Sequence, residues 1–244
     1  MSGLIYKNFL INKWSFLFSL ITALLCGLVA VLMSIFTGGA DSLRQESDAE
    51  SVTCVFAVLY YLAFMLPSMT TSLLFEADEN KTACAFAMST PQGGKGHVES
   101  KYYYILILNI IVMFMLFVCD TITTGLFKGA VSASLILMLF FCWRLFISAI
   151  EIPFIIRFGS QRGAAIKGVV VSVLVVIIGI YFLFGDISWL IGTDDPIASF
   201  AEWLQSGDIT FWISLFPYFA IAAYYISCRI STVLFRKGAE SYEQ

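Results

Sequence analysis

Charged residues are scarce in this sequence of 244 residues, and their scarcity decides the class of protein. Asp, Glu, Lys and Arg make up 13% of the chain, whereas about 25% is usual in a soluble domain. Hydrophobic residues make up 59%. So little polar surface cannot cover a water-soluble core of this size. The composition therefore predicts an integral membrane protein.

Histidine and the motifs of nucleotide chemistry are missing as well. His97 is the single histidine, so a cluster of histidine ligands for a catalytic metal is excluded. Gly94-Lys95 comes nearest to a phosphate-binding loop, but Gly96 follows where serine or threonine is required. No serine stands on a glycine-flanked turn beside a partner base. We therefore expect no catalytic site and no bound cofactor in this chain.

The six cysteines do not form a framework for a metal or for disulfides. None belongs to a CxxC pair, and the predicted outer loops contain no obvious pair. Five of them lie in or at the ends of long apolar blocks, so we interpret the cysteines as packing residues.

What the sequence does contain is six apolar blocks of about 20 residues, the length that crosses a hydrocarbon layer about 30 Å thick. They lie at 14–36, 52–75, 102–121, 130–150, 166–185 and 209–228. The first block is longer than the core of a signal peptide, about 7–15 residues, so an uncleaved helix is favoured over a signal peptide. Residues 1–244 are thus expected to form one all-α, polytopic transmembrane domain with six spans.

The basic residues indicate how these spans are oriented. Twelve of the 14 Lys and Arg residues fall on the segments that share a side with both termini, and only Arg44 and Lys128 fall on the opposite side. Cytoplasmic segments hold the excess of Lys and Arg in membrane proteins. We therefore predict that the N-terminus and the C-terminus both lie in the cytoplasm.

The longest inner segment, 76–101, is predicted to carry structure of its own. It opens with an acidic turn, continues as a helix-compatible stretch and breaks at Pro91 and a run of glycines. A surface helix followed by a flexible break suits a docking element. The charged residues of its first half are Glu76, Asp78, Glu79 and Lys81.

Two further short helices are expected outside the apolar blocks. Residues 1–13 place apolar side chains at helical spacing, which predicts a helix on the cytoplasmic leaflet or an extension of the first span. In the outer segment 186–208, Asp195-Pro196 is typical of a helix start. It predicts a short helix half buried in the outer leaflet, with a structured cap on the last two spans as the alternative.

The inner segment resembles that of the ABC-2 type permeases. An acidic stretch beginning at Glu76, a break at Pro91 and then Ser100-Lys101-Tyr102 leading into the third span follow in the order of the short six-span bacterial branch. Met88-Ser89-Thr90 and the glycines that follow Pro91 depart from the family pattern. In size and general character the chain is also similar to the permeases that export phenol-soluble modulins.

The resemblance implies the membrane subunit of an ATP-driven exporter in the bacterial cytoplasmic membrane. Two permease subunits, identical or related, would work with two separate ATPase subunits that bind ATP and Mg²⁺, and the cargo would be amphipathic peptides or other hydrophobic compounds. It also implies that Glu76, Asp78, Glu79 and Lys81 lie on a cytoplasmic coupling helix, with a solvated acidic loop as the alternative. Because the basic residues are dispersed, no nucleic-acid partner is expected.

One pair of opposite charges lies in the fourth span. Arg144 and Glu151 are seven residues apart, which puts both side chains on one helical face, about 10 Å apart along the axis. An unpaired charge at this depth costs about 2.5–3.5 kcal/mol. Arg144 is therefore predicted to face the translocation path or the subunit interface, or alternatively to snorkel to lipid phosphates with Glu151 as its counter-ion.

A path for the cargo is expected between two subunits, because six helices of this length pack into a bundle without a lumen. In the second span Tyr61, Met65 and Met69 recur every four residues on one face. Flexible, apolar side chains accept varied shapes. This face is predicted to line the path or the dimer interface, with ordinary packing as the alternative.

Two other classes of function stay open at this stage. An autonomous channel or secondary transporter usually carries intramembrane acidic or histidine residues for ion coupling, and the middles of the other five blocks are free of charge. A membrane assembly protein would need no site at all, so composition does not separate it from a permease.

Overall fold

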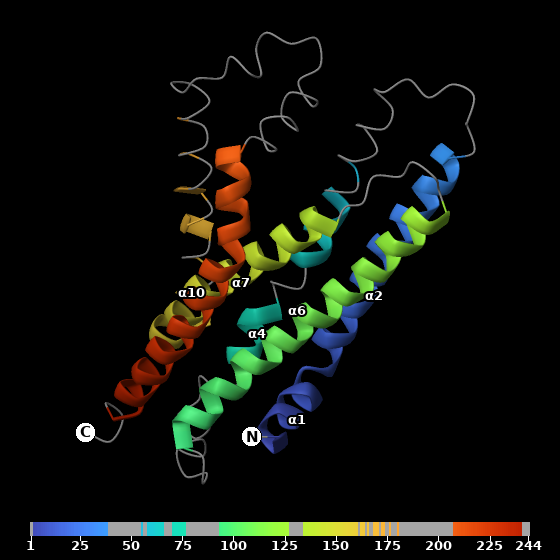
Figure 1. Cartoon of the computed structure of the whole chain (residues 1–244). Coiled ribbons are helices and arrows are strands. Elements are labelled where there is room, and N and C mark those ends of the chain that lie inside the picture. Colours follow the sequence, from blue (N-terminus) through green and yellow to red (C-terminus); the bar gives the residue numbers. More distant parts are fainter. Residues whose placement is uncertain are drawn as a thin grey trace.

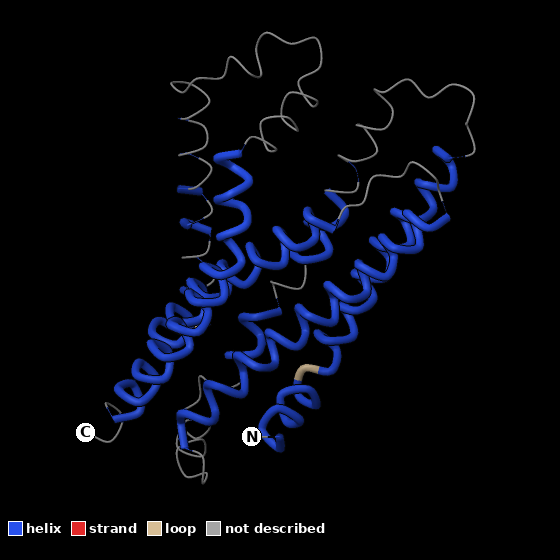
Figure 2. Tube along the Cα trace, in the orientation of Figure 1, coloured by secondary structure: helices blue, strands red, loops and turns tan. Residues whose placement is uncertain are grey.

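Every regular element that the structure describes is a helix (Figure 2). The computed structural model describes residues 2–38, 55, 58–65, 70–76, 93–126, 134–160, 207–240 and ten positions between 162 and 180. Its principal helices are α1 (Ser2–Ile11), α2 (Lys13–Gly38), α4 (Thr70–Glu76), α6 (Gly93–Leu126), α7 (Ser134–Phe158) and α10 (Gly207–Glu240). The predicted all-α fold is confirmed for these residues.

Among the residues that the structure describes, four helices are long and apolar enough to cross a membrane. They are Lys13–Leu32 of α2, Gly93–Gly125 of α6, Ser134–Phe158, which is α7, and Ser214–Lys237 of α10. Each overlaps one predicted apolar block, and residues 58–65 and 70–75 of the second block are helical too. The helix expected within 186–208 lies outside the described residues. The count of six spans and the orientation stay predictions.

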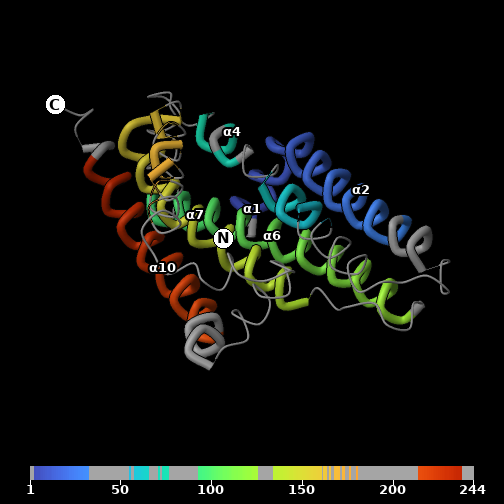
Figure 3. The backbone as a smooth tube through the Cα atoms, turned by 90° about the horizontal axis from the view of Figure 1, so that it is seen from above, coloured from blue at the N-terminus to red at the C-terminus, as the bar shows by residue number. Residues whose placement is uncertain are grey.

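The long helices form two pairs with the short α4 between them (Figure 1). Helices α2 and α6 lie side by side, and α7 packs along α10. The view from above places α4 between α7 and α2 (Figure 3). The start of α1, the start of α6 and the end of α10 lie at one end of the bundle, which we call the basic end because it carries Lys7, Lys95, Arg236 and Lys237.

Apolar side chains cover the outside of this bundle, and many polar ones lie inside. Large side chains such as Phe114 and Ile221 are exposed, whereas Asn109, Ser148 and Ser231 are buried. A soluble protein shows the opposite distribution. In a lipid environment, buried polar groups must find partners within the protein, and the Asn109 amide does so by donating to the Ile105 carbonyl over 2.8 Å.

Helices α2 and α6 approach closely along a line of small residues. Ser19, Ala23, Gly27 and Ala30 follow at spacings of three or four along α2, and all four are buried. A Cβ atom added at Gly27 would lie 2.6 Å from the Cys119 sulfur of α6. Small residues let two membrane helices gain dispersion energy over a long contact.

The N-terminal segment forms a helix of its own, α1, that packs against the first turns of α6. An amphipathic helix would bury its apolar side chains and expose its polar ones. In α1, however, Asn8 is buried while Tyr6 and Leu10 are exposed. The break from α2 falls at Asn12, whose side-chain amide donates to the Asn8 carbonyl over 3.2 Å. The face of α1 that carries Asn8 therefore packs against the rest of the protein.

The contact at Gly27 gives the first testable prediction. Gly27→Ala should lower the free energy of unfolding by about 1–3 kcal/mol, because the added methyl group overlaps the Cys119 sulfur. Thermal unfolding in detergent micelles measures the effect. The matched control is Gly125→Ala on α6, where an added Cβ meets nothing within 4 Å.

Gly125→Ala should be neutral or slightly stabilising, because alanine favours a helix by about 1 kcal/mol over glycine. Adding Cys119→Ala to Gly27→Ala removes the sulfur atom and should restore part of the lost stability. A Gly27→Ala protein that melts at or above the wild-type temperature would contradict the close approach of α2 and α6.

Candidate functional site

Three consecutive polar residues at the basic end of α6 are buried: Ser100, Lys101 and Tyr102 are 1%, 2% and 3% exposed. Successive residues of a helix point about 100° apart, so three in a row can reach three different neighbours. Here they contact α1, α4 and α10. We call Ser100, Lys101 and Tyr102 the junction.

Ser100 joins α6 to α1. The side-chain amide of Asn8 donates to the Ser100 hydroxyl oxygen over 3.1 Å, and that hydroxyl donates in turn to the His97 carbonyl over 2.7 Å. The ring of Phe9 adds an edge-on contact with Tyr104 at 4.8 Å between centroids. The buried Asn8 of α1 is thus explained by its partner on α6.

Lys101 joins α6 to α4. Its ammonium group donates to the Leu74 carbonyl over 2.9 Å and lies 4.2 Å from the centroid of the Phe75 ring. Because α4 ends at Glu76 and α6 begins at Gly93, this one side chain fastens both ends of the predicted docking segment. A displacement of either end is therefore passed to the other.

Tyr102 joins α6 to α10 and, through α10, to α7. Its hydroxyl lies 2.7 Å from the hydroxyls of Ser227 and Ser231, and Tyr224 donates to the Tyr102 carbonyl over 2.8 Å. Ser227 also donates to the Ala149 carbonyl of α7 over 2.5 Å. A single buried phenol is thus the centre of a network across three helices.

The predicted charged pair lies inside the bundle. Arg144 and Glu151 are each 2% exposed, with Nη1 of Arg144 at 3.8 Å from Oε2 of Glu151. Nη2 of Arg144 donates to the Thr71 hydroxyl of α4 over 2.8 Å. The guanidinium therefore points toward α4 instead of snorkelling outward. Its partner Thr71 is a residue that the sequence pattern did not single out.

The predicted coupling residues are described only in part. Glu76 is the last residue of α4 and is exposed. Asp78, Glu79 and Lys81 lie outside the described residues, so their place on a coupling helix stays a prediction.

The predicted path or dimer face is also described in part. Tyr61 is 42% exposed, and its ring packs edge-on against Phe140 of α7 at 5.6 Å between centroids. Met65 is half-buried, and Met69 lies outside the described residues. The opposite face of this helical stretch, with Tyr60 and Phe64, is buried. The Tyr61 side is thus the one open to the surroundings, and its role stays a prediction.

Metal chemistry has no support in the part of the chain that the structure describes, where no group of three His, Cys, Asp or Glu residues could hold an ion. In the same part Cys26, Cys119, Cys142 and Cys228 are free thiols. Three of them lie in or against the apolar core, Cys142 as a buried residue and Cys26 and Cys228 packed against it.

Comparison with known proteins shows the family. The family described as ABC-2 family transporter protein matches residues 3–236, nearly the whole chain. No curated protein and no solved structure matches the chain. The chain therefore belongs to the ABC-2 transporter family. Together with its four helices of spanning length, this makes it a multi-pass membrane protein and a permease of an ABC transporter.

The junction would have been hard to find from sequence alone. Ser100-Lys101-Tyr102 carried the family resemblance, yet Lys101 counted there as one more cytoplasmic charge and Tyr102 as the first residue of a span. One signal was present, namely three hydrogen-bonding residues side by side just before an apolar run. The serines of α10 gave no signal, because nothing in the sequence around Ser227 and Ser231 shows that their hydroxyls face Tyr102.

The Tyr102 network gives the second prediction. Tyr102→Phe removes the hydroxyl that lies between Ser227 and Ser231 and should lower the free energy of unfolding by about 1–3 kcal/mol. The matched control is Tyr103→Phe, since the neighbouring Tyr103 is 48% exposed and should lose nothing. Equal melting temperatures for the two variants would contradict the buried network.

The charged pair gives the third prediction. Arg144→Met removes the cation that lies 3.8 Å from the buried Glu151 carboxylate and should cost about 3–5 kcal/mol of stability. The double variant Arg144→Met with Glu151→Gln should recover a large part, because the side chain at 151 is then neutral as well. Arg157→Met on the same helix is the control, since Arg157 is exposed. Thermal unfolding that ranks the double variant below Arg144→Met would sink this interpretation.

Proposed function

We propose that this chain is the membrane-spanning subunit of an ATP-driven exporter of amphipathic peptides or other hydrophobic compounds in the bacterial cytoplasmic membrane. It has no catalytic site and no cofactor of its own, and a separate ATPase subunit binds ATP and Mg²⁺. Two copies, or one copy and a related permease, form the transporter with two ATPase subunits. Membership of the ABC-2 family supports the requirement for an ATPase partner.

The observation that carries the proposal is the junction at the start of α6. A subunit that hydrolyses nothing must receive a mechanical displacement and pass it to the spans. Lys101 fastens both ends of the segment between Glu76 and Gly93, and its neighbours Ser100 and Tyr102 fasten α1 and α10. A push on that segment would therefore move several helices together instead of bending one.

Burial strengthens the hydrogen bonds of the junction, which helps it to transmit a displacement to the helices. Hydrogen bonds between groups shielded from water are stronger than exposed ones, and a buried donor that loses its acceptor is costly. Lys101 is 2% exposed, and Tyr224, which donates to the Tyr102 backbone, is also buried. The polar bonds are thus expected to hold while the apolar helix contacts slide.

The nature of the cargo is supported by the side of the second predicted span that remains open. Tyr61 is exposed and Met65 half-buried, and adaptable apolar side chains suit a cargo of varied shape. If two subunits meet on this side, a path would run between them. Cysteines at Tyr61, Met65 and Met69 in a background free of native cysteines should crosslink between subunits or be protected by cargo.

The direct test is co-purification with an ABC ATPase followed by an ATPase assay in lipid. The proposal predicts a stable complex whose ATP hydrolysis is stimulated by an amphipathic peptide, and Glu79→Lys should abolish the stimulation without preventing assembly. Failure of any ABC ATPase to assemble with this chain, or full coupling in assembled Glu79→Lys, would count against the proposal.

The junction gives the fourth prediction. Lys101→Met removes the bond to the Leu74 carbonyl, and transport per ATP hydrolysed should fall about tenfold, as expected for the loss of one charge-assisted hydrogen bond. Lys95→Met is the matched control, because Lys95 lies on the same helix and its side chain is 58% exposed. Cargo uptake into inverted vesicles measures transport. Wild-type transport by Lys101→Met would contradict the proposed transmission.

A further inference from the structure

A cation lies within the exposed apolar face of α10. Arg229 is exposed, and its neighbours on this face, Ile226, Ile230 and Val233, are exposed apolar residues. Arg229 also falls within the stretch of α10 that is apolar enough to span a membrane. A guanidinium in such surroundings requires an anion or water, because an unpaired charge is costly in hydrocarbon.

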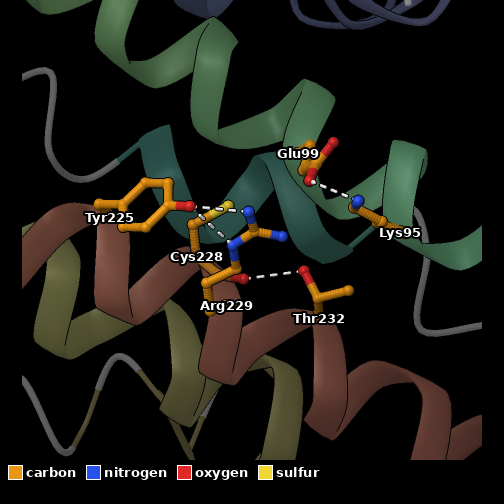
Figure 4. A network of polar contacts seen from close by, with 6 residues as sticks. All are labelled: Lys95, Glu99, Tyr225, Cys228, Arg229 and Thr232. Carbon is orange, nitrogen blue, oxygen red and sulfur yellow. Dashed lines mark hydrogen bonds and ion pairs between the residues drawn. The ribbon is translucent and has the colours of Figure 1, made fainter.

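The Arg229 side chain is held in place by a tyrosine one turn earlier. Nε and Nη2 of Arg229 both donate to the Tyr225 hydroxyl, over 3.1 and 2.7 Å, and the guanidinium carbon lies 5.1 Å from the centroid of the tyrosine ring. Figure 4 shows the guanidinium directed toward α6 in this arrangement. Both side chains are exposed, so Tyr225 fixes the position of the guanidinium while leaving it accessible to a ligand.

A second cation, Lys95, lies on α6. Lys95 pairs with Glu99 over 3.8 Å, and its side chain is 58% exposed. Figure 4 shows Lys95 and Glu99 on the side of α6 nearest Arg229. Glu99 also acts electrostatically on Arg229, so the cluster holds two cations and one carboxylate and keeps one positive charge in excess. This charge is complementary to a phosphate group.

The predicted orientation puts this cluster near the cytoplasmic membrane interface. The hydroxyls of Ser227 and Tyr102 are in contact, so Arg229, two residues further along α10, is level with Glu99, three residues earlier on α6. Tyrosine and tryptophan mark membrane interfaces. Tyr225 marks this level on α10, and on α2 the exposed Trp14 with the Lys13 ammonium 6.0 Å from its ring marks the same end of the bundle.

We infer that Arg229, organised by Tyr225 and assisted by Lys95, binds the phosphate of an anionic phospholipid from the cytoplasmic leaflet. The lipid chains lie along the exposed apolar face of α10, and the phosphate accepts hydrogen bonds from the guanidinium of Arg229. The inference rests on the predicted orientation of the bundle and is independent of ATP coupling, so an uncoupled complex would leave it intact.

The test uses the full-length protein in detergent micelles, titrated with phosphatidylglycerol and, separately, with phosphatidylcholine. Phosphatidylglycerol should raise the melting temperature of the wild type, and phosphatidylcholine should raise it much less. Arg229→Gln should need about fivefold more phosphatidylglycerol for half the shift, the loss expected for one basic residue at an anionic surface. Tyr225→Phe keeps the Arg229 cation but removes the hydroxyl that positions it, so its affinity for phosphatidylglycerol should fall less than that of Arg229→Gln.

Arg236→Gln is the control for charge alone, because Arg236 is an exposed cation seven residues further along the same helix. It should lose clearly less than Arg229→Gln. Identical lipid responses of Arg229→Gln and the wild type would overturn the inference. So would an equal, Arg229-dependent shift with inorganic phosphate in phosphatidylcholine, which would make this a site for free phosphate. Loss of a dimer in Arg229→Gln, measured by light scattering without added lipid, would assign the face to a second copy.

Discussion

The hydrogen bond from the Lys101 ammonium to the Leu74 carbonyl is the contact on which the rest of this account depends. It is buried, and it closes the chain between the end of α4 and the start of α6. Without it, α4 and α6 would lose the directed polar contact that joins the two ends of the segment following Glu76. With it, the segment has a fixed base, and a force applied there acts on α4 and α6 as one unit.

A second buried cation fixes α4 from the other side. Arg144 donates to Thr71 near the start of this seven-residue helix, while Lys101 holds the Leu74 carbonyl near its end. A helix this short has little stability of its own, so these two partners set its position together with the packing of Leu74 and Phe75 in the apolar core. Charges buried in an apolar bundle are expensive, and here both are used to position the helix that leads to the predicted docking segment.

Much of the fold could be predicted from the sequence, because apolar runs and their length report directly on a bilayer. The Arg144–Glu151 pair was also predictable, since seven residues return a helix to nearly the same face. The direction in which Arg144 points was not, because Thr71 is distant in sequence. Likewise, the positive-inside rule applies to Lys101 whether its side chain is solvated or buried. For Asn8, a helical projection shows that the residue is polar but does not show which face of the helix packs against a neighbour. These placements depend on tertiary packing.

The most direct measurement is the distance between spin labels on α4 and α6 during the ATP cycle. Leu73 and Tyr103 are both exposed and adjoin Leu74 and Tyr102, so each can be replaced by a labelled cysteine in a background free of native cysteines. Double electron–electron resonance on the complex with its ATPase should give one distance distribution in the ATP-free and vanadate-trapped states, and a broader one once Lys101→Met is added. A wild-type distribution that shifts between the two states would show that α4 and α6 do not move as one unit, and would contradict the account.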